Sequence, residues 1–153
     1  MLKPAYQPIS EGPAPPYLAS KTLTFDGTSG LGLAGTNAVL FTVTGQVLIF
    51  QIVPFCTTDL TEALATAQVS LGVVGSTVLW IALTNSVLID ANEFWVTTTP
   101  TPNGIALPTA MGIGVAITDN IVIACATQNT NGGVIRVDAL WRPLSSDGNV
   151  VPA

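Results

Sequence analysis

The sequence predicts an all-β fold: an antiparallel β-sandwich, jelly-roll-like, with an extended proline-rich N-terminal arm. Three observations predict it. Short apolar–polar alternations recur along the chain, residues typical of turns divide them, and the strands do not alternate with helical stretches. About nine predicted strands fit an eight-stranded jelly roll best, with an immunoglobulin-like sandwich as the second choice. Because 153 residues suffice for one hydrophobic core, we expect a single β-sandwich domain over residues 19–153.

Residues 1–18, with the sequence MLKPAYQPISEGPAPPYL, differ in composition from the rest of the chain. Proline-rich segments favour an extended polyproline conformation of about 3.1 Å per residue, and this one has few aliphatic side chains for a core. It is either a loose tail or an arm that lies along a neighbouring subunit. In the second interpretation, its contact residues are Pro4, Tyr6, Pro13, Pro15, Pro16 and Tyr17.

The first half of the domain is predicted to contain five strands. They cover residues 22–25, 38–43, 46–55, 67–73 and 78–83, the last of which also fits a short helix. Both registers of 46–55 are apolar, which is typical of a strand covered on both faces. The alternation in 67–73 directs Val69, Leu71 and Val73 toward the core. Asp59 is expected to cap one helical turn over residues 59–64.

The second half is predicted to contain four more strands. They cover residues 93–98, 112–117, 121–127 and 134–141. Asn131-Gly132-Gly133 is expected to form a hairpin turn before the last of these strands. In that strand Ile135, Val137, Ala139 and Trp141 should face the core, and Arg136 and Asp138 should face outward.

The chain carries unusually few charges for its hydropathy. Charged residues make up 8% of it, against about 25% in a typical soluble domain, and the mean hydropathy is +0.58. This composition indicates either a lipid environment or a surface covered by other subunits, because interface cores are also poor in charge. Residues 38–56 approach the length of a membrane span, but their polar residues and Gly45 favour two strands. The prolines near the N-terminus leave no visible targeting signal.

Lys3, Lys21, Arg136 and Arg142 are the only basic residues, and the net charge is −5. Nucleic-acid binding depends on clustered Lys and Arg, so we predict no nucleic-acid partner. Arg136 and Arg142 are the best candidates for polar interface contacts, because a guanidinium group can form paired hydrogen bonds with a carboxylate.

The chain has no histidine, which removes the commonest general base and the commonest metal ligand. Two carboxylate pairs, Asp59 with Glu62 and Asp90 with Glu93, fit turn capping better than metal ligation. The GxGxxG pattern at residues 30–35 is followed by a predicted strand instead of a helix, so it indicates a surface loop. We predict that the chain is not an enzyme and holds no cofactor or metal.

Cysteine and tryptophan leave alternatives open. Cys56 and Cys125 are either two buried free thiols or, less in keeping with the rest of the sequence, a disulfide. Trp141 is predicted in the core. Trp95 is predicted to face outward, where it would serve as an interface anchor or stack on a sugar ring.

Thr/Gly/Val-rich strands on a short chain are evident in residues 24–32 (TFDGTSGLG), 40–45 (LFTVTG) and 56–61 (CTTDLT), and in NGG at 131–133 and WRPLS at 141–145. Together these stretches resemble the small head decoration, or cement, proteins of tailed bacteriophages. The resemblance implies a β-sandwich, commonly trimeric, on the outer capsid surface across capsomer boundaries. It extends equally to phage tail or fibre components.

The expected function is therefore that of a structural virion protein that binds the outer capsid surface and stabilises the shell. Its expected partners are the major capsid protein and sister subunits in a homotrimer, with no membrane and no small-molecule ligand, after synthesis in the host cytoplasm. Two alternatives from other classes remain, a glycan-binding module that uses Trp95 and a carboxylate-based hydrolase.

Overall fold

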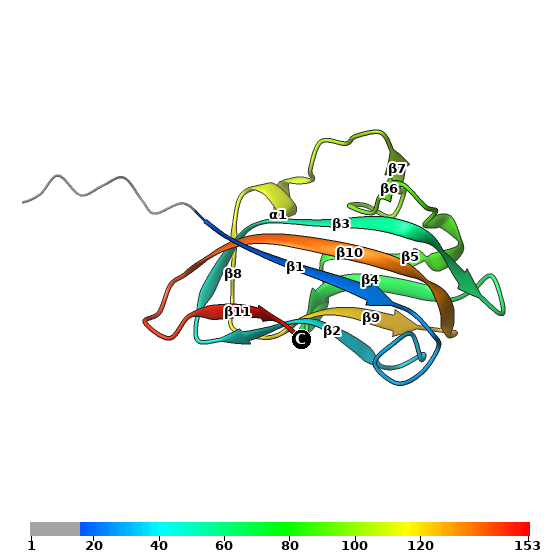
Figure 1. Cartoon of the computed structure of the whole chain (residues 1–153), viewed down its shortest axis with the longest axis horizontal. Helices are drawn as coiled ribbons and strands as arrows, with labels where there is room; N and C mark the ends of the chain where they lie inside the picture. Colours follow the sequence, from blue (N-terminus) through cyan, green and yellow to red (C-terminus); the bar gives the residue numbers. More distant parts are fainter. Residues whose placement is uncertain (1–15) are drawn as a thin grey trace, which may run out of the picture.

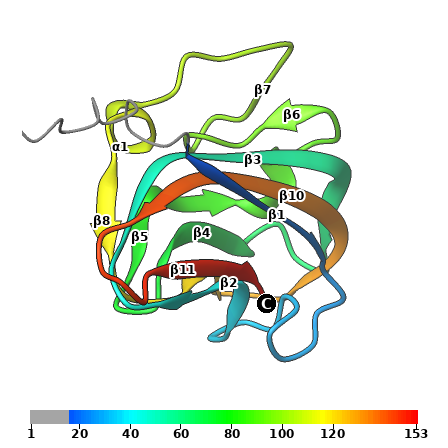
Figure 2. The same ribbon diagram turned by 60° about the vertical axis from the view of Figure 1, so that its left-hand side comes forward.

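A computed structural model describes residues 16–153, and the arm residues 1–15 lie outside the described part of the chain. The described chain forms two antiparallel sheets that face each other (Figures 1 and 2). The β3 sheet contains, in spatial order, β1 (Tyr17–Thr24), β10 (Thr130–Pro143), β3 (Val47–Glu62), β6 (Glu93–Phe94) and β7 (Thr101–Pro102), and β8 (Val115–Ile117) also pairs with β3. The β9 sheet contains β11 (Asn149–Pro152), β2 (Asn37–Thr44), β9 (Ile121–Ala126), β4 (Gln68–Val73) and β5 (Ser76–Asn85).

The strand pairings are nested, as in a jelly roll. β1 pairs with β10, β2 with β9, β3 with β8 and β4 with β5, each time antiparallel. The chain thus behaves as one long hairpin rolled into two layers, with strands that are distant in sequence lying side by side. The predicted all-β sandwich is confirmed, and β6, β7 and β11 are additions to the eight nested strands.

The core lies between the two sheets and follows the predicted alternation. In β10, Ile135, Val137 and Ala139 are fully buried, as expected, while Arg136 and Asp138 point outward. The opposite layer supplies buried side chains from β2, β4 and β9. The largest fully buried side chains are Trp95, Phe41, Leu40, Ile49, Ile52, Leu71, Ile81, Ile89, Met111, Ile121, Ile123 and Ile135.

β3 explains why both registers of its sequence are apolar. Leu140 pairs with Gln51 and Trp141 with Ile49, so Phe50 is an extra residue in β3 and forms a bulge. Ile49 and Ile52 face the core, while Phe50 lies on the outer side, half-buried. The bulge therefore preserves an apolar inner face and still places an aromatic ring outside.

Several predicted boundaries are wrong, and in each case long-range pairing decides. The strand predicted over 22–25 begins at Tyr17, within the last two residues of the predicted arm, because β1 pairs along its whole length with β10. The helical turn predicted over 59–64 is strand as far as Glu62, since β3 continues to pair with β10. Asp59 accepts a hydrogen bond from the Ala91 backbone N–H (2.6 Å) instead of capping a helix.

The hairpin turn predicted at 131–133 is also wrong. These residues lie inside β10, where the pairing with β3 shifts register twice. Gly133 has a φ of 105°, and a Cβ there would lie 2.5 Å from the Asp59 carbonyl oxygen, so glycine is required for a close strand contact instead of a turn. The chain reverses earlier, around Thr127, which has a φ of 68°.

Two short helical segments complete the described chain: η1 (Ser86–Leu88) and α1 (Thr109–Gly112). The segment from β6 to α1 lies beyond the β3 strand in both views (Figures 1 and 2). It replaces most of the strand predicted over residues 93–98. The strand predicted over residues 112–117 begins only at Val115, in β8, because α1 extends to Gly112. No helix in residues 16–153 has the length and apolar character needed to cross a membrane.

Candidate interaction surfaces

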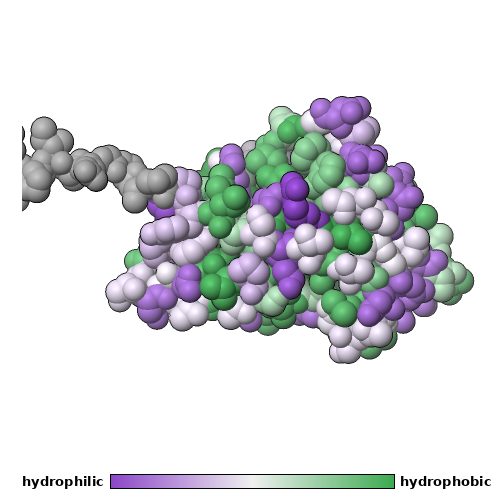
Figure 3. All heavy atoms as spheres, viewed as in Figure 1, coloured by the Kyte–Doolittle hydropathy of each residue, from purple (hydrophilic) through white to green (hydrophobic). Residues whose placement is uncertain are grey.

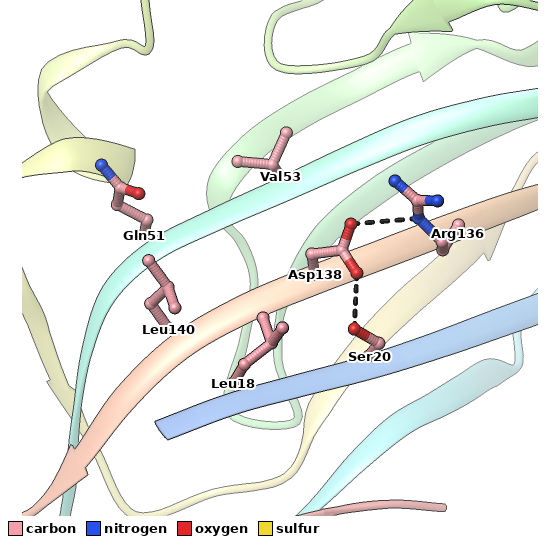
Figure 4. A pocket seen from close by; sticks show the side chains of 7 residues that line it. All are labelled: Leu18, Ser20, Gln51, Val53, Arg136, Asp138 and Leu140. Atoms are coloured by element: carbon pink, nitrogen blue, oxygen red, sulfur yellow. Dashed lines mark hydrogen bonds and ion pairs between the residues drawn. The ribbon is translucent and has the colours of Figure 1, made fainter. Parts of the chain in front are cut away.

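The outer face of the β3 sheet contains an open groove with a volume of about 560 Å³. Cross-strand pairing places Leu18, Leu140 and Gln51 in one row across β1, β10 and β3, and Ser20, Asp138 and Val53 in the next. These six side chains and Arg136 line the groove (Figure 4). Leu18 is 65% exposed, a large value for a leucine on a paired strand.

A polar cluster occupies one end of this groove. Asp138 accepts a hydrogen bond from the Ser20 hydroxyl (Oδ1, 2.6 Å) and forms an ion pair with Arg136 Nε (Oδ2, 3.0 Å). The ion pair uses Nε alone, and Figure 4 marks no interaction of the two terminal nitrogens of Arg136 with the residues drawn. The groove therefore presents guanidinium N–H donors beside apolar side chains, which suits a polypeptide that carries a carboxylate.

A second hollow of about 340 Å³ continues the groove past Gln51 and Leu140, which line both. Its other lining residues are Pro16, Phe50, Gly112 and Arg142. The Arg142 guanidinium carbon lies 5.1 Å from the centre of the Phe50 ring, within the range of a cation–π contact. Figure 3 shows hydrophobic side chains on either side of a strongly hydrophilic group over this part of the molecule. We call the two hollows together the β3 groove.

The β9 sheet differs in charge. Within the described chain, its five strands contain no Asp, Glu, Lys or Arg. The strands of the β3 sheet, by contrast, contain Lys21, Asp59, Glu62, Glu93, Arg136, Asp138 and Arg142. The charged residues of the described strands thus all lie in the β3 sheet, and the strands of the β9 sheet have none.

The outer face of the β9 sheet is built from small and apolar side chains. Val39, Val122 and Gly72 form one cross-strand row, and Val151 pairs with Thr42 beside it. Val122 is fully buried but does not belong to the central core, so its neighbours on this outer face cover it. Val39 and Val151 remain 38% and 42% exposed. The face has no ionic side chain on its strands, as is typical of the central part of a protein interface, although it includes the exposed polar side chains of Thr42 and Thr44.

Trp95 is not exposed, so the prediction that it faces outward is wrong. Its side chain has no exposed area, and its Nε1–H donates a hydrogen bond of 3.0 Å to the Thr84 hydroxyl. Trp95 follows the short strand β6, and the chain turns it inward where an uninterrupted strand would not. A buried indole can neither anchor a partner nor stack on a sugar ring, and this removes the observation on which the glycan-binding alternative depended.

The other predicted contact residues fall into two groups. Pro4, Tyr6, Pro13 and Pro15 lie outside the described residues. Pro16, Arg136 and Arg142 all line the β3 groove, although no sequence pattern indicates that they lie together. Tyr17 is 55% exposed and packs against Trp141, with 4.9 Å between the ring centres.

Sequence reasoning missed most of the apolar surface residues. Leu18 falls in the predicted arm, and Val53 and Val122 lie in strands whose two registers are both apolar. Periodicity alone cannot say which of two apolar registers faces the core.

Val39 was not detectable in the sequence either. Strict alternation groups it with Phe41 and Val43, which are buried, and only the register shift between Val39 and Phe41 turns it outward. Leu140 is different, because it shares the predicted outward register of Arg136 and Asp138.

Both cysteines are buried free thiols, one in each sheet: Cys56 in β3 and Cys125 in β9. Burial raises the pKa of each thiol to about 11. For Cys56 a backbone hydrogen bond with Thr58 opposes this increase in pKa, and the nearby carboxylates of Asp59, Asp90 and Glu93 add to it. The thiols are therefore protonated at neutral pH and act as small apolar side chains.

The paired carboxylates serve local structure. Glu93 accepts a hydrogen bond from the Asp90 backbone N–H (3.2 Å), and Glu62 accepts one from the Ser86 hydroxyl. Among the described residues, no group of three or more Asp, Glu or Cys side chains is placed to hold a metal ion. The glycine-rich loop at 30–35 leads into strand β2, so it offers no helix N-terminus to a phosphate.

Scans of protein-family models, of curated proteins and of solved structures gave no match to this chain.

Proposed function

We propose that this chain is a non-enzymatic structural protein of a virus particle, a decoration protein that binds the outer surface of the capsid and stabilises it. The observation that carries the proposal is the uncharged β9 sheet. None of its five strands in the described chain has an ionic side chain, so contact with another protein removes no charged strand residue from water and buries the exposed apolar ones.

The fold supports the same function. Jelly rolls are common in viral capsid proteins, although they also occur in lectins and cupins. A fold by itself does not establish a function, so this support is an analogy. The net charge of −5 favours a position on the outside of the shell, away from the genome.

The mechanism is mass action. A protein that binds the assembled shell, and not its separated subunits, stabilises the assembly by its free energy of binding. A trimer linked through its own contacts would engage several sites at once, and the second and third contacts then become intramolecular. Each contact can therefore be weak and uncharged while the whole attachment is strong.

The first test asks whether the chain is in the particle. Particles purified from the source of this chain by density gradient should contain it in a fixed ratio to the major capsid protein, as measured by quantitative mass spectrometry. Particles stripped of the chain should disassemble at a lower temperature and regain stability when the purified chain is added. Particles without the chain, or with only traces of it, would refute the proposed function.

The second test asks which face attaches. Val39→Asp places a charge on the exposed part of the β9 sheet, and Ile113→Asp places one on a side chain that is 73% exposed outside that face. We expect Val39→Asp to weaken co-sedimentation with stripped particles by about tenfold or more, equivalent to about 1.4 kcal/mol, and the Ile113→Asp control to bind normally. Normal binding by both variants would show that another face makes the attachment.

A further inference from the structure

The β3 groove has a composition that fits a proline-rich polypeptide. It combines the apolar side chains of Leu18, Val53 and Leu140 with the Phe50 ring. Grooves that bind extended proline-rich segments are lined by aromatic and other apolar side chains. Such a segment is recognised through its side chains, because its extended backbone does not need to pair with a strand. The groove crosses only three strands, about 10 Å at the usual spacing of about 4.8 Å, so a few extended residues fill its width.

The chain itself contains such a segment, and it begins at the groove. Residues 1–15 include Pro4, Pro8, Pro13 and Pro15, and Pro16, the first described residue, lines the groove. In polyproline geometry fifteen residues span roughly 45 Å, which is several times the width of the groove. The segment therefore has the length to leave one molecule and cross a second.

One acidic residue of the segment can pair with a cation of the groove. Residues 1–15 contain one acidic residue, Glu11, and one basic residue, Lys3. The groove carries Arg136, which pairs with Asp138 through Nε alone, and Arg142. A carboxylate in the bound segment would find a guanidinium group beside the apolar floor.

Proline chemistry favours a second molecule over the same one. A residue that precedes proline is restricted to extended conformations, and proline itself has a fixed φ, so Pro13-Ala14-Pro15-Pro16 disfavours a reversal next to β1. A segment that continues in the direction of β1 would run away from the groove of its own molecule. In a closed oligomer every copy would donate one segment and receive one, so no groove stays empty.

From these observations we propose that residues 1–15 of one copy bind in the β3 groove of a second copy and join the subunits into an oligomer. This inference concerns contacts between copies of the chain and goes beyond the attachment of the chain to a shell. The occupant is the N-terminal segment of a sister molecule, held by apolar contacts with Leu18, Val53 and Leu140 and by a pairing of Glu11 with a groove arginine.

The test uses the purified full chain in the absence of any particle. Analytical ultracentrifugation should show an oligomer for the unaltered chain. We expect Leu140→Asp, and separately the deletion of residues 1–12, to raise the dissociation constant by about tenfold or more. The Leu64→Asp control, at an exposed side chain that does not line the groove, should associate normally, and far-UV circular dichroism should show that every variant is folded.

Cross-linking identifies the donor and the acceptor. A Ser10→Cys chain and a differently tagged Ser20→Cys chain are mixed, allowed to exchange and treated with a short bismaleimide; the native thiols do not compete because both are buried. We expect a product that carries both tags, and much less of it when Val151→Cys, on the β9 sheet, replaces Ser20→Cys.

Three results would overturn the inference: a monomer at all concentrations, equal cross-linking to positions 20 and 151, or cross-linking to position 20 only when both cysteines are in one chain. The last result would place the segment in its own groove. A chain that assembles in this way but does not bind particles would refute the proposed function alone, whereas a chain that binds particles without exchanging its segment would refute only this inference.

Discussion

The two sheets of this sandwich have similar inner faces and different outer faces. Inside, both contribute aliphatic side chains and one buried thiol each. Outside, the β3 sheet carries Arg136, Asp138 and Arg142 around an apolar groove, whereas the β9 sheet has no ionic side chain on any of its strands in the described chain. The inner faces pack against each other and form the core. The difference between the two sheets is therefore confined to their outer faces, which are the faces open to partners.

The outer surfaces also differ in relief. In the β9 sheet the backbone of Ser76 and Thr77 lies over Gly72, beside the buried Val122, while the bulge at Phe50 and the long Arg side chains give the β3 sheet a groove. A face without ionic side chains fits a protein surface, and a groove with arginines fits an extended chain. Five predictions test this contrast, and they are given in decreasing order of the change that each should produce.

The same substitution in the two outer faces should have unequal effects on folding. Val122→Lys places an ammonium group where the side chain is fully buried, and Val53→Lys places one beside Asp138 in the open groove. We expect a loss of about 3 kcal/mol of unfolding free energy for Val122→Lys and less than about 1 kcal/mol for Val53→Lys. Urea denaturation followed by tryptophan fluorescence measures both. Equal losses would show that the two faces are packed alike.

The two thiols should be protected alike, because both point into the shared interior. A pKa of about 11, instead of the ordinary value, leaves about a hundredfold less thiolate at pH 8. We expect the folded chain to react with a disulfide reagent at least about a hundredfold more slowly than the urea-unfolded chain. A single fast thiol, identified by mass spectrometry, would show that one sheet is open at that position.

The raised thiol pKa also determines how stability depends on pH. The folded state favours the protonated thiol, and this preference contributes to the unfolding free energy. The contribution is fully present below the unfolded-state pKa and is lost as pH rises toward 11. The unfolding free energy should therefore decline above about pH 9, and the decline should be smaller in the double variant Cys56→Ala, Cys125→Ala.

One buried hydrogen bond joins the two layers, and its loss should have an intermediate effect. Thr84 of β5 accepts from the Trp95 indole N–H, which comes from the segment after β6. Thr84→Val keeps the shape but leaves the indole N–H unpaired, so we expect a loss of about 1–3 kcal/mol in unfolding free energy. Thr22→Val, on the exposed outer side of β1, is the control and should change stability by less than about 0.5 kcal/mol.

The ion pair in the β3 groove should contribute least to folding. Arg136 and Asp138 are 52% and 30% exposed, and exposed ion pairs contribute about 0–1 kcal/mol. We expect Asp138→Asn to lower the unfolding free energy by less than about 1 kcal/mol, and the difference from the unaltered chain to diminish in high salt. A loss above about 2 kcal/mol would indicate that the cluster is structural and not a contact surface.

The sequence predicted the fold class well because strand alternation is a local property. The inward and outward residues of β10 were predicted correctly from period-2 alternation alone. The helical turn at 59–64 and the hairpin turn at 131–133 were predicted incorrectly, because Asp59 and Gly133 were judged by local turn preferences while the pairing of β3 with β10 determined their conformation. Trp95 was misplaced for a related reason: β6 ends at Phe94, so alternation no longer applies at position 95.

The candidate surfaces were only partly predictable. Arg136 and Arg142 were identified as contact residues from their chemistry, since four cations in an apolar chain stand out. Their position beside Leu18, Val53 and Phe50 depends on three strands that are far apart in sequence. The absence of charge from one whole sheet was not detectable either, because successive strands such as β1 and β2, β2 and β3, or β9 and β10 belong to different layers.

Composition and alternation, which are properties of short stretches, are enough to identify a charge-poor, strand-rich sandwich with an inner face on each strand. Which strands share a layer, and hence the separation of an uncharged sheet from a grooved and charged one, follows only from the folded chain. Nested pairing is the cause: it joins β1 to β10 and β2 to β9 across most of the chain, so no local pattern contains the neighbours of a given side chain.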